Sequence, residues 1–89
     1  MDFSVYILFS ATHQKNYVGF TSDLINRMKS HNQLGNDWTK KFRPWQVVHL
    51  EFYNSKQDAM AREKYFKSGR GLYIKKQIIL DFLLSSSVG

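Results

Sequence analysis

The strongest restriction on the fold comes from apolar side chains that occupy every second position near the N-terminus. They are Phe3, Val5, Ile7 and Phe9. This two-residue period is typical of a strand with one apolar face, so Tyr6 is expected to point to the other face. A second run of strand-forming residues spans 17–20, after a polar stretch at 10–16. The two runs predict an antiparallel hairpin, in which we expect Tyr6 to pair with Tyr17.

A helix and a third strand are predicted after the hairpin. The helix begins at 21–23, where a hydroxyl can cap the first turn and an acid meets the helix dipole, and it runs to about Leu34. Residues 46–53 alternate again and are predicted to form a strand. The apolar face of this strand is expected to carry Val48, Leu50 and Phe52.

Two more helices complete the chain. A capping-box pattern, in which a serine is followed three residues later by an acid, predicts a helix over 55–68. Gly69 and Gly71 are expected to end it. Apolar residues at helical spacing predict the last helix over 73–84, and the serine-rich residues 85–89 are expected to form a flexible tail.

The predicted order of elements, β-β-α-β-α-α, indicates an α+β fold with a small three-stranded antiparallel sheet flanked by helices. With 89 residues, the chain is predicted to be a single domain over 1–84. The absence of cysteine excludes a disulfide scaffold and a zinc ribbon. We expect a cytoplasmic protein with no membrane partner, because the N-terminus lacks the features of a secretion signal and no apolar run is long enough to span a bilayer.

Glu63 is the most unusual residue of the predicted second helix. It shares a helical stripe with Ala59, Met60 and Phe66, where an apolar side chain would be expected. A carboxylate buried there without a partner would cost several kcal/mol, so it must be paired, protonated or bound to a cation. A partly exposed glutamate in an ion pair with Lys67 is the alternative, and the pattern alone does not decide between them.

Arg27 and His31 lie four residues apart and share one face of the first predicted helix. A guanidinium binds phosphate through two parallel hydrogen bonds, and an imidazole can donate or transfer a proton near neutral pH. Because this helix follows the second strand directly, both side chains could reach a site beside Tyr6 and Tyr17. The alternative is a solvated helix face next to structural tyrosines.

Basic residues give the chain a net charge of +6 and a pI near 9.7, which favours an anionic partner. Residues 56–76 hold seven basic and two acidic residues, a net charge of +5. A second basic segment also contains the aromatic residues Trp38, Phe42 and Trp45. The two segments predict a surface for nucleic-acid phosphates with rings for base stacking. Its candidate residues are Lys40, Lys41, Arg43, Lys64, Lys67 and Arg70. Alternatively, the charges only solubilise helices and the tryptophans fill the core.

The order and spacing of these candidates resemble the GIY-YIG nuclease family over residues 4–76. The resemblance is carried by Val5-Tyr6-Ile7, Tyr17-Val18-Gly19, Arg27, His31 and Glu63. It looks most like the small single-domain bacterial members related to the N-terminal nuclease domain of the excision-repair excinuclease. This chain departs from the family pattern at Val5, which replaces the first glycine, and at Phe20, where some members carry a basic residue.

The resemblance implies an endonuclease that hydrolyses DNA phosphodiester bonds, in DNA repair or recombination, with one divalent cation, Mg²⁺ or Mn²⁺. It implies that Glu63 holds the cation, that Tyr17 is the general base toward water and that Arg27 stabilises the charge developing on the phosphate. Tyr6 and His31 would support this site. No small-molecule cofactor is expected, and the sequence does not indicate a protein partner.

Two other functions stay open at this stage. The chain could be a nucleic-acid-binding module that has the nuclease fold but little or no activity. It could also be an accessory subunit, in which the apolar last helix, residues 74–84, docks against another protein.

Overall fold

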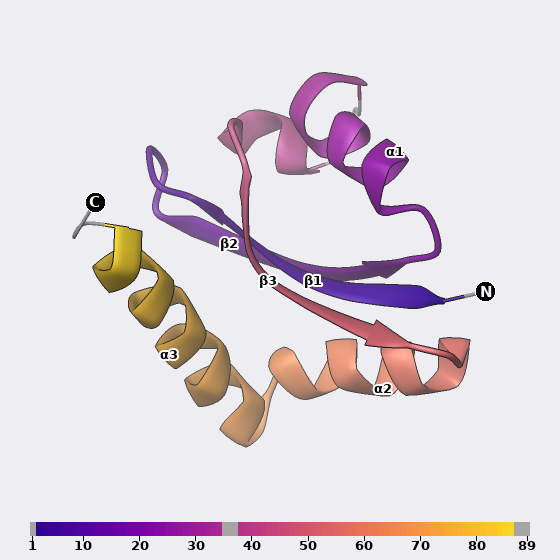
Figure 1. Ribbon diagram of the computed structural model, residues 1–89. Coiled ribbons are helices and arrows are strands. Elements are labelled where there is room, and N and C mark those ends of the chain that lie inside the picture. Colours follow the sequence, from indigo (N-terminus) through magenta and orange to yellow (C-terminus); the bar gives the residue numbers. More distant parts are fainter. Residues whose placement is uncertain (1, 35–37, 87–89) are drawn as a thin grey trace.

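The computed structural model describes residues 2–34 and 38–86 (Figure 1). Its elements are β1 (Phe3–Ser10), β2 (Lys15–Thr21), α1 (Leu24–Lys29), the π-helical turn η1 (Ser30–Leu34), the 3-10 helix η2 (Trp38–Phe42), β3 (Gln46–Tyr53), α2 (Lys56–Phe66) and α3 (Gly69–Ser86). The predicted α+β fold and order of elements are confirmed. Within the described ranges, no helix has the length and apolar character needed to cross a membrane.

The central strand of the sheet is β1, because the strand order is β2-β1-β3 with antiparallel pairing throughout. α2 and α3 lie on one side of the sheet, and α1, η1 and η2 lie on the other (Figure 1). The alternating apolar residues of β1 face α2 and α3, whereas Tyr6 faces the opposite side, as predicted, together with Leu8. This double cover explains why β1 is buried along almost its whole length.

The predicted register of the hairpin is wrong by two residues. Tyr6 lies opposite Gly19, and Tyr17 lies opposite Leu8. The polar residues 15 and 16 extend β2 toward the turn, which hydropathy does not reveal. Gln14 ends the turn with a φ of 55°, a left-handed conformation that lets the chain reverse within a few residues.

The bounds predicted for β3 match the structure, but the prediction of its apolar face is wrong. The register with β1 shifts between Ile7 and Leu8, because Val48 is an additional residue in a β-bulge. Val48 therefore packs in the core with α2 and α3, whereas Leu50 packs on the opposite face of the sheet. Phe52 belongs to neither cluster and is 66% exposed.

Of the two glycines that were expected to end the second-to-last helix, Gly69 separates it from the last helix, as predicted, whereas Gly71 does not. α2 begins as predicted after Ser55, whose hydroxyl accepts hydrogen bonds from two backbone amides of the first turn, at 3.1 and 3.4 Å. α3 begins at Gly69 rather than at residue 73, and the φ of +56° at Gly69 separates the helices. Gly71 lies inside α3 against the backbone carbonyl of Tyr65, where no Cβ would fit.

The C-terminal helix is also longer than predicted at its other end. α3 continues to Ser86, so residues 85 and 86 are helical rather than part of a tail. The other residues of the predicted tail, 87–89, lie outside the described residues.

Candidate active site

The pairing of β1 with β2 places the hydroxyl of Tyr6 directly over Gly19. Tyr6 is fully buried on the face of the sheet that carries α1. A Cβ at Gly19 would lie 2.5 Å from the Tyr6 hydroxyl oxygen and 3.0 Å from the ring of Tyr17. Glycine is therefore required here for space, since any side chain would displace the two tyrosines.

His31 from η1 joins the two tyrosines. It is fully buried, and its Nε2 lies 3.0 Å from the hydroxyl of Tyr6. Its ring centroid lies 4.9 Å from that of Tyr17, and the centroids of Tyr6 and Tyr17 are 6.3 Å apart. Three rings from separate segments of the chain thus form one cluster.

Arg27 from α1 supplies the positive charge of this cluster. Its guanidinium lies close enough to the hydroxyls of Tyr6 and Tyr17 for the interaction to raise the pKa of Arg27, with the larger effect from Tyr6. Burial raises the pKa of Tyr6, although the neighbouring Arg27 opposes this. The cluster therefore combines a permanently charged guanidinium with a Tyr6 phenol that stays neutral at physiological pH.

Glu63 lies on α2, at the side of the helix rather than at the centre of its buried face. Ala59 and Phe66 are fully buried, whereas the Glu63 side chain is 21% exposed and Met60 is 41% exposed. One carboxylate oxygen of Glu63 lies 3.6 Å from Nζ of Lys67, which is the ion pair considered from the sequence. The negative charge of Glu63 also contributes to the raised pKa of Tyr6, so Glu63 lies within electrostatic range of the ring cluster.

The single carboxylate of Glu63 is suited to a cation that keeps most of its water. In the part of the chain that the structure describes, no three His, Asp or Glu side chains lie close enough together to share a metal ion. Mg²⁺ needs no such cage, because it usually keeps several waters and is held by one or two carboxylates together with substrate phosphates. A partly exposed carboxylate in a loose ion pair fits this mode of binding.

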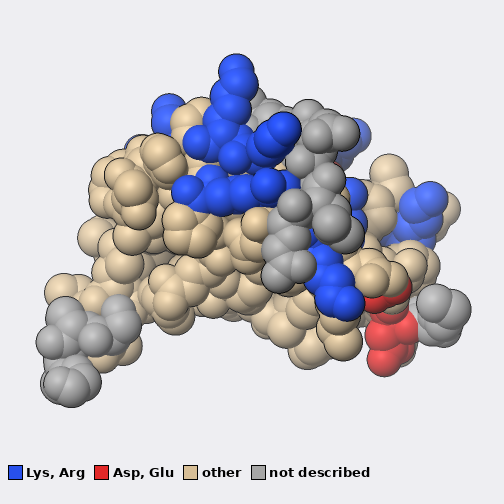
Figure 2. All heavy atoms as spheres, turned by 90° about the horizontal axis from the view of Figure 1, so that it is seen from above, with Lys and Arg blue, Asp and Glu red and all other residues tan. Residues whose placement is uncertain are grey.

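The basic residues singled out in the sequence lie on both sides of the sheet. Lys40 and Lys41 are exposed on η2, and Figure 2 shows Lys and Arg side chains gathered on the face that carries α1 and η2. The other exposed candidates lie on α2 and at the junction with α3. They are Lys64, Lys67 and Arg70. The predicted basic surface is therefore divided into two groups.

Arg43 and the aromatic residues of this basic segment have a structural role. Arg43 donates from its guanidinium to the backbone carbonyls of His31, at 2.6 Å, and of Ser30, at 3.0 Å, and so stabilises η1. Trp45 is only 5% exposed and packs against Tyr6, so it is not available for stacking on a base. The side chain of Trp38 lies outside the described residues.

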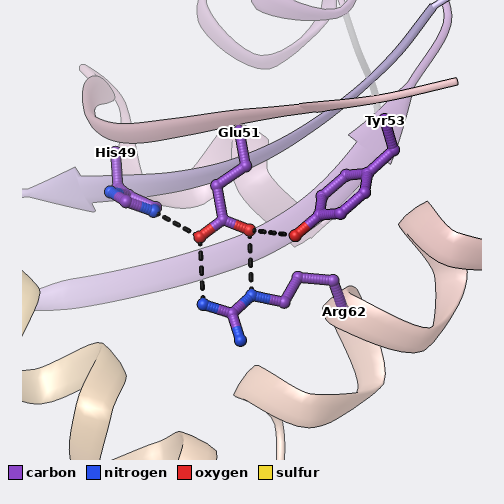
Figure 3. Close-up of polar contacts among 4 residues, drawn as sticks. All are labelled: His49, Glu51, Tyr53 and Arg62. Atoms are coloured by element: carbon purple, nitrogen blue, oxygen red, sulfur yellow. Dashed lines mark hydrogen bonds and ion pairs between the residues drawn. The ribbon is translucent and has the colours of Figure 1, made fainter.

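A second polar cluster, which the sequence did not indicate, lies on the α2 side of β3 (Figure 3). Arg62 from α2 binds both carboxylate oxygens of Glu51, at 2.9 and 3.1 Å. His49 and Tyr53 each contact the same carboxylate at 2.7 Å. Burial alone would raise the pKa of Glu51, but these three partners outweigh it and lower the pKa to about 2. The cluster joins α2, which carries Glu63, to the edge strand β3.

Comparison with known proteins gives matches over most of the chain. Residues 2–75 match the family described as the GIY-YIG catalytic domain. The UPF0213 protein YazA of Bacillus subtilis is 38% identical over 66 residues, which cover 68% of this chain and 67% of the relative. A UPF0213 protein of Pediococcus pentosaceus is 42% identical over 52 residues, 57% of this chain and 55% of the relative. The chain thus spans between about half and two thirds of the length of these two relatives.

A solved structure gives the same picture of the fold. The solution NMR structure of the UPF0213 protein BH0048 of Bacillus halodurans superimposes with a TM-score of 0.53 at 31% sequence identity. The match covers 89% of this chain and 83% of the other. The three-stranded α+β architecture predicted from the sequence is therefore shared with a known structure.

Proposed function

Because the chain belongs to the GIY-YIG family, we propose that it is an endonuclease that hydrolyses phosphodiester bonds of DNA with one divalent cation. The observation that carries this proposal is the convergence of four groups from separate segments. The Arg27 guanidinium meets the hydroxyls of Tyr6 and Tyr17, and the imidazole of His31 completes the cluster. Such a set offers both a binding site for a phosphate and groups that can accept or donate protons.

Arg27 is the residue that stabilises the negative charge developing on the phosphate. Its guanidinium interacts with two phenol hydroxyls, and we propose that they orient it, so that little reorganisation is needed when a phosphate binds. The guanidinium also stays charged at any working pH and offers several donors in one plane. A donor of this kind typically contributes about 10² to 10³ in rate.

The two tyrosines differ in burial, and this difference supports different roles for them. Tyr17 is half-buried, so its hydroxyl is assigned to the attacking water as general base. Tyr6 is fully buried and bound to His31, so it is assigned to orient Arg27 and the neighbouring phenol. His31 in turn holds the Tyr6 hydroxyl through the contact at 3.0 Å.

Glu63 is the residue that would hold the cation, Mg²⁺ or Mn²⁺. A bound cation would offset negative charge on the phosphate and on the leaving oxygen. Glu63 lies within electrostatic range of Tyr6 and is partly exposed, and we propose that a cation on its carboxylate acts on the same phosphate as Arg27, which lies on the other side of the sheet. Lys67 is more than half exposed, and its ion pair with Glu63 is long enough to be displaced.

The exposed cations are assigned to the flanking phosphates of the DNA. Lys40 and Lys41 would bind on the α1 side of the sheet, while Lys64, Lys67 and Arg70 would bind on the side of Glu63. The proposed place of action is the cytoplasm, in repair or recombination of DNA.

A cleavage assay tests this proposal. Labelled duplex, branched and single-stranded DNA are incubated with the protein in Mg²⁺, in Mn²⁺ and in chelator. The Glu63→Gln variant is compared with Asp58→Asn, which removes an exposed acid of the same helix. We expect cleavage that requires the cation, is lost in Glu63→Gln and is retained in Asp58→Asn. If no substrate is cut while wild type and Glu63→Gln bind DNA equally, the chain is a binding module and the proposal fails.

A further inference from the structure

Thr39 makes a buried contact with the site, although it does not belong to the motif that carries the resemblance. It is only 1% exposed, and its hydroxyl oxygen lies 2.9 Å from Nδ1 of His31. Its backbone carbonyl accepts a hydrogen bond from the indole N–H of Trp45 at 2.8 Å. Thr39 is thus held from one side by a buried tryptophan and touches His31 with the other.

The direction of the hydrogen bonds follows from counting donors at the hydroxyl of Tyr6. A buried hydroxyl needs an acceptor for its proton. Tyr6 is fully buried, and among the described residues the acceptor that lies within reach of its proton is Nε2 of His31, at 3.0 Å. A neutral imidazole that accepts at Nε2 carries its proton on Nδ1, and Nδ1–H then donates to Thr39.

We propose that Thr39 is a positioning residue, whose hydroxyl oxygen holds His31 in the Nδ1–H tautomer and thereby fixes the orientation of the Tyr6 hydroxyl. The opposite tautomer would direct Nε2–H at the hydroxyl oxygen of Tyr6. The proton of Tyr6 would then lose its buried acceptor, and the phenol would turn away from Arg27. The catalytic consequence of this role rests on the proposed nuclease function, but the tautomer itself does not.

The same segment of the chain also fixes the backbone of His31. Arg43 binds the carbonyl of His31 at 2.6 Å. The side chain of Asn32 accepts from the backbone N–H of Trp45 at 2.7 Å and donates to its carbonyl at 3.2 Å. Residues 39–45 therefore hold the backbone of η1 through several hydrogen bonds that do not involve the Thr39 hydroxyl. The role left for this hydroxyl is to determine which imidazole nitrogen of His31 carries the proton.

Two variants distinguish the effect of the Thr39 hydroxyl from the effect of its side-chain volume. Thr39→Val keeps the volume and removes the hydroxyl, whereas Thr39→Ser keeps the hydroxyl. Long-range ¹H–¹⁵N NMR spectra of the imidazole, assigned with the His31→Gln variant, report which ring nitrogen carries the proton. We expect Nδ1–H in wild type and in Thr39→Ser, and a shift toward Nε2–H in Thr39→Val. In the cleavage assay we expect kcat to fall about tenfold in Thr39→Val with KM unchanged, and to be largely restored in Thr39→Ser.

Each result has a defined meaning. Nε2–H in wild type overturns the proposal without any variant, so the test survives even if Thr39→Val does not fold. An unchanged tautomer in a folded Thr39→Val protein also overturns it. If the tautomer shifts as expected but wild type cuts no DNA, the positioning role stands and the nuclease proposal fails.

Discussion

Replacing Glu51 with glutamine is expected to destabilise the protein strongly at neutral pH and hardly at all in acid. The carboxylate is 19% exposed and has three partners, of which Arg62 binds both oxygens. Glutamine keeps the shape of the side chain but cannot match the charge of Arg62. The guanidinium would then be left partly buried beside a neutral amide.

The size of the effect follows from the pKa of Glu51, which is lowered from 4.5 to about 2. A shift of one unit corresponds to about 1.4 kcal/mol, so the charged form stabilises the folded state by at most about 3 kcal/mol, and solvent screening reduces this to about 2 kcal/mol. A carboxyl whose pKa is lower in the folded protein stabilises it above the unfolded pKa. This stabilisation is complete above about pH 5.5 and is lost as the pH falls from about 4.5 toward 2.

Urea unfolding, followed by the fluorescence of the buried Trp45, measures this difference. At pH 7 we expect Glu51→Gln to lower the free energy of unfolding by about 2 kcal/mol, and at pH 2.5 by less than about 1 kcal/mol. Asp81→Asn removes an exposed acid of α3 and serves as the control, with no comparable loss at either pH. An equal loss for Glu51→Gln at both pH values would refute the assignment of this stabilisation to the charged carboxylate.

Three further substitutions probe the site and the core. Gly19→Ala places a Cβ 2.5 Å from the Tyr6 hydroxyl oxygen and should reduce the cleavage rate by about 10²-fold, while the circular dichroism spectrum stays native. A cleavage rate equal to that of wild type would contradict the close packing at Gly19. Arg27→Lys keeps the charge but loses the planar donor fork, so single-turnover cleavage should slow by about 10²-fold, and an undiminished rate would argue against a role for that fork. Phe66→Ala empties a fully buried position and should cost about 3 to 4 kcal/mol in urea unfolding, whereas a loss under about 1 kcal/mol would show that Phe66 is not a core residue.

The strands could be predicted from the sequence because their hydropathy alternates, but their pairing could not. The bounds of β3 were predicted correctly, since strand-forming residues fill 46–53 without interruption. The bulge at Val48 arises from the pairing with β1 and leaves no mark in the hydropathy of β3. It reverses the facing of every residue after it, which explains why Glu51 was not recognised as part of a cluster.

The candidate site could be predicted mainly from the spacing of its residues along the chain. Arg27 and His31 were expected to share one helical face, and both reach Tyr6, although α1 ends at Lys29 and His31 lies in η1. Thr39 and Arg43 gave no such signal, because their contacts with η1 join segments that have no common period. A basic residue next to lysines indicates a phosphate contact, and only the folded chain reveals that Arg43 binds carbonyl oxygens instead.

The central claim, that Tyr6 and Arg27 act as one unit on the phosphate, is tested most directly by a double-mutant cycle. Single-turnover cleavage is measured for wild type, Tyr6→Phe, Arg27→Met and the double variant. Because the Tyr6 hydroxyl and the guanidinium interact with each other, we expect the double variant to be little slower than Arg27→Met alone. Rate losses that multiply in the double variant would contradict the claim, since they would mean that the two groups act independently.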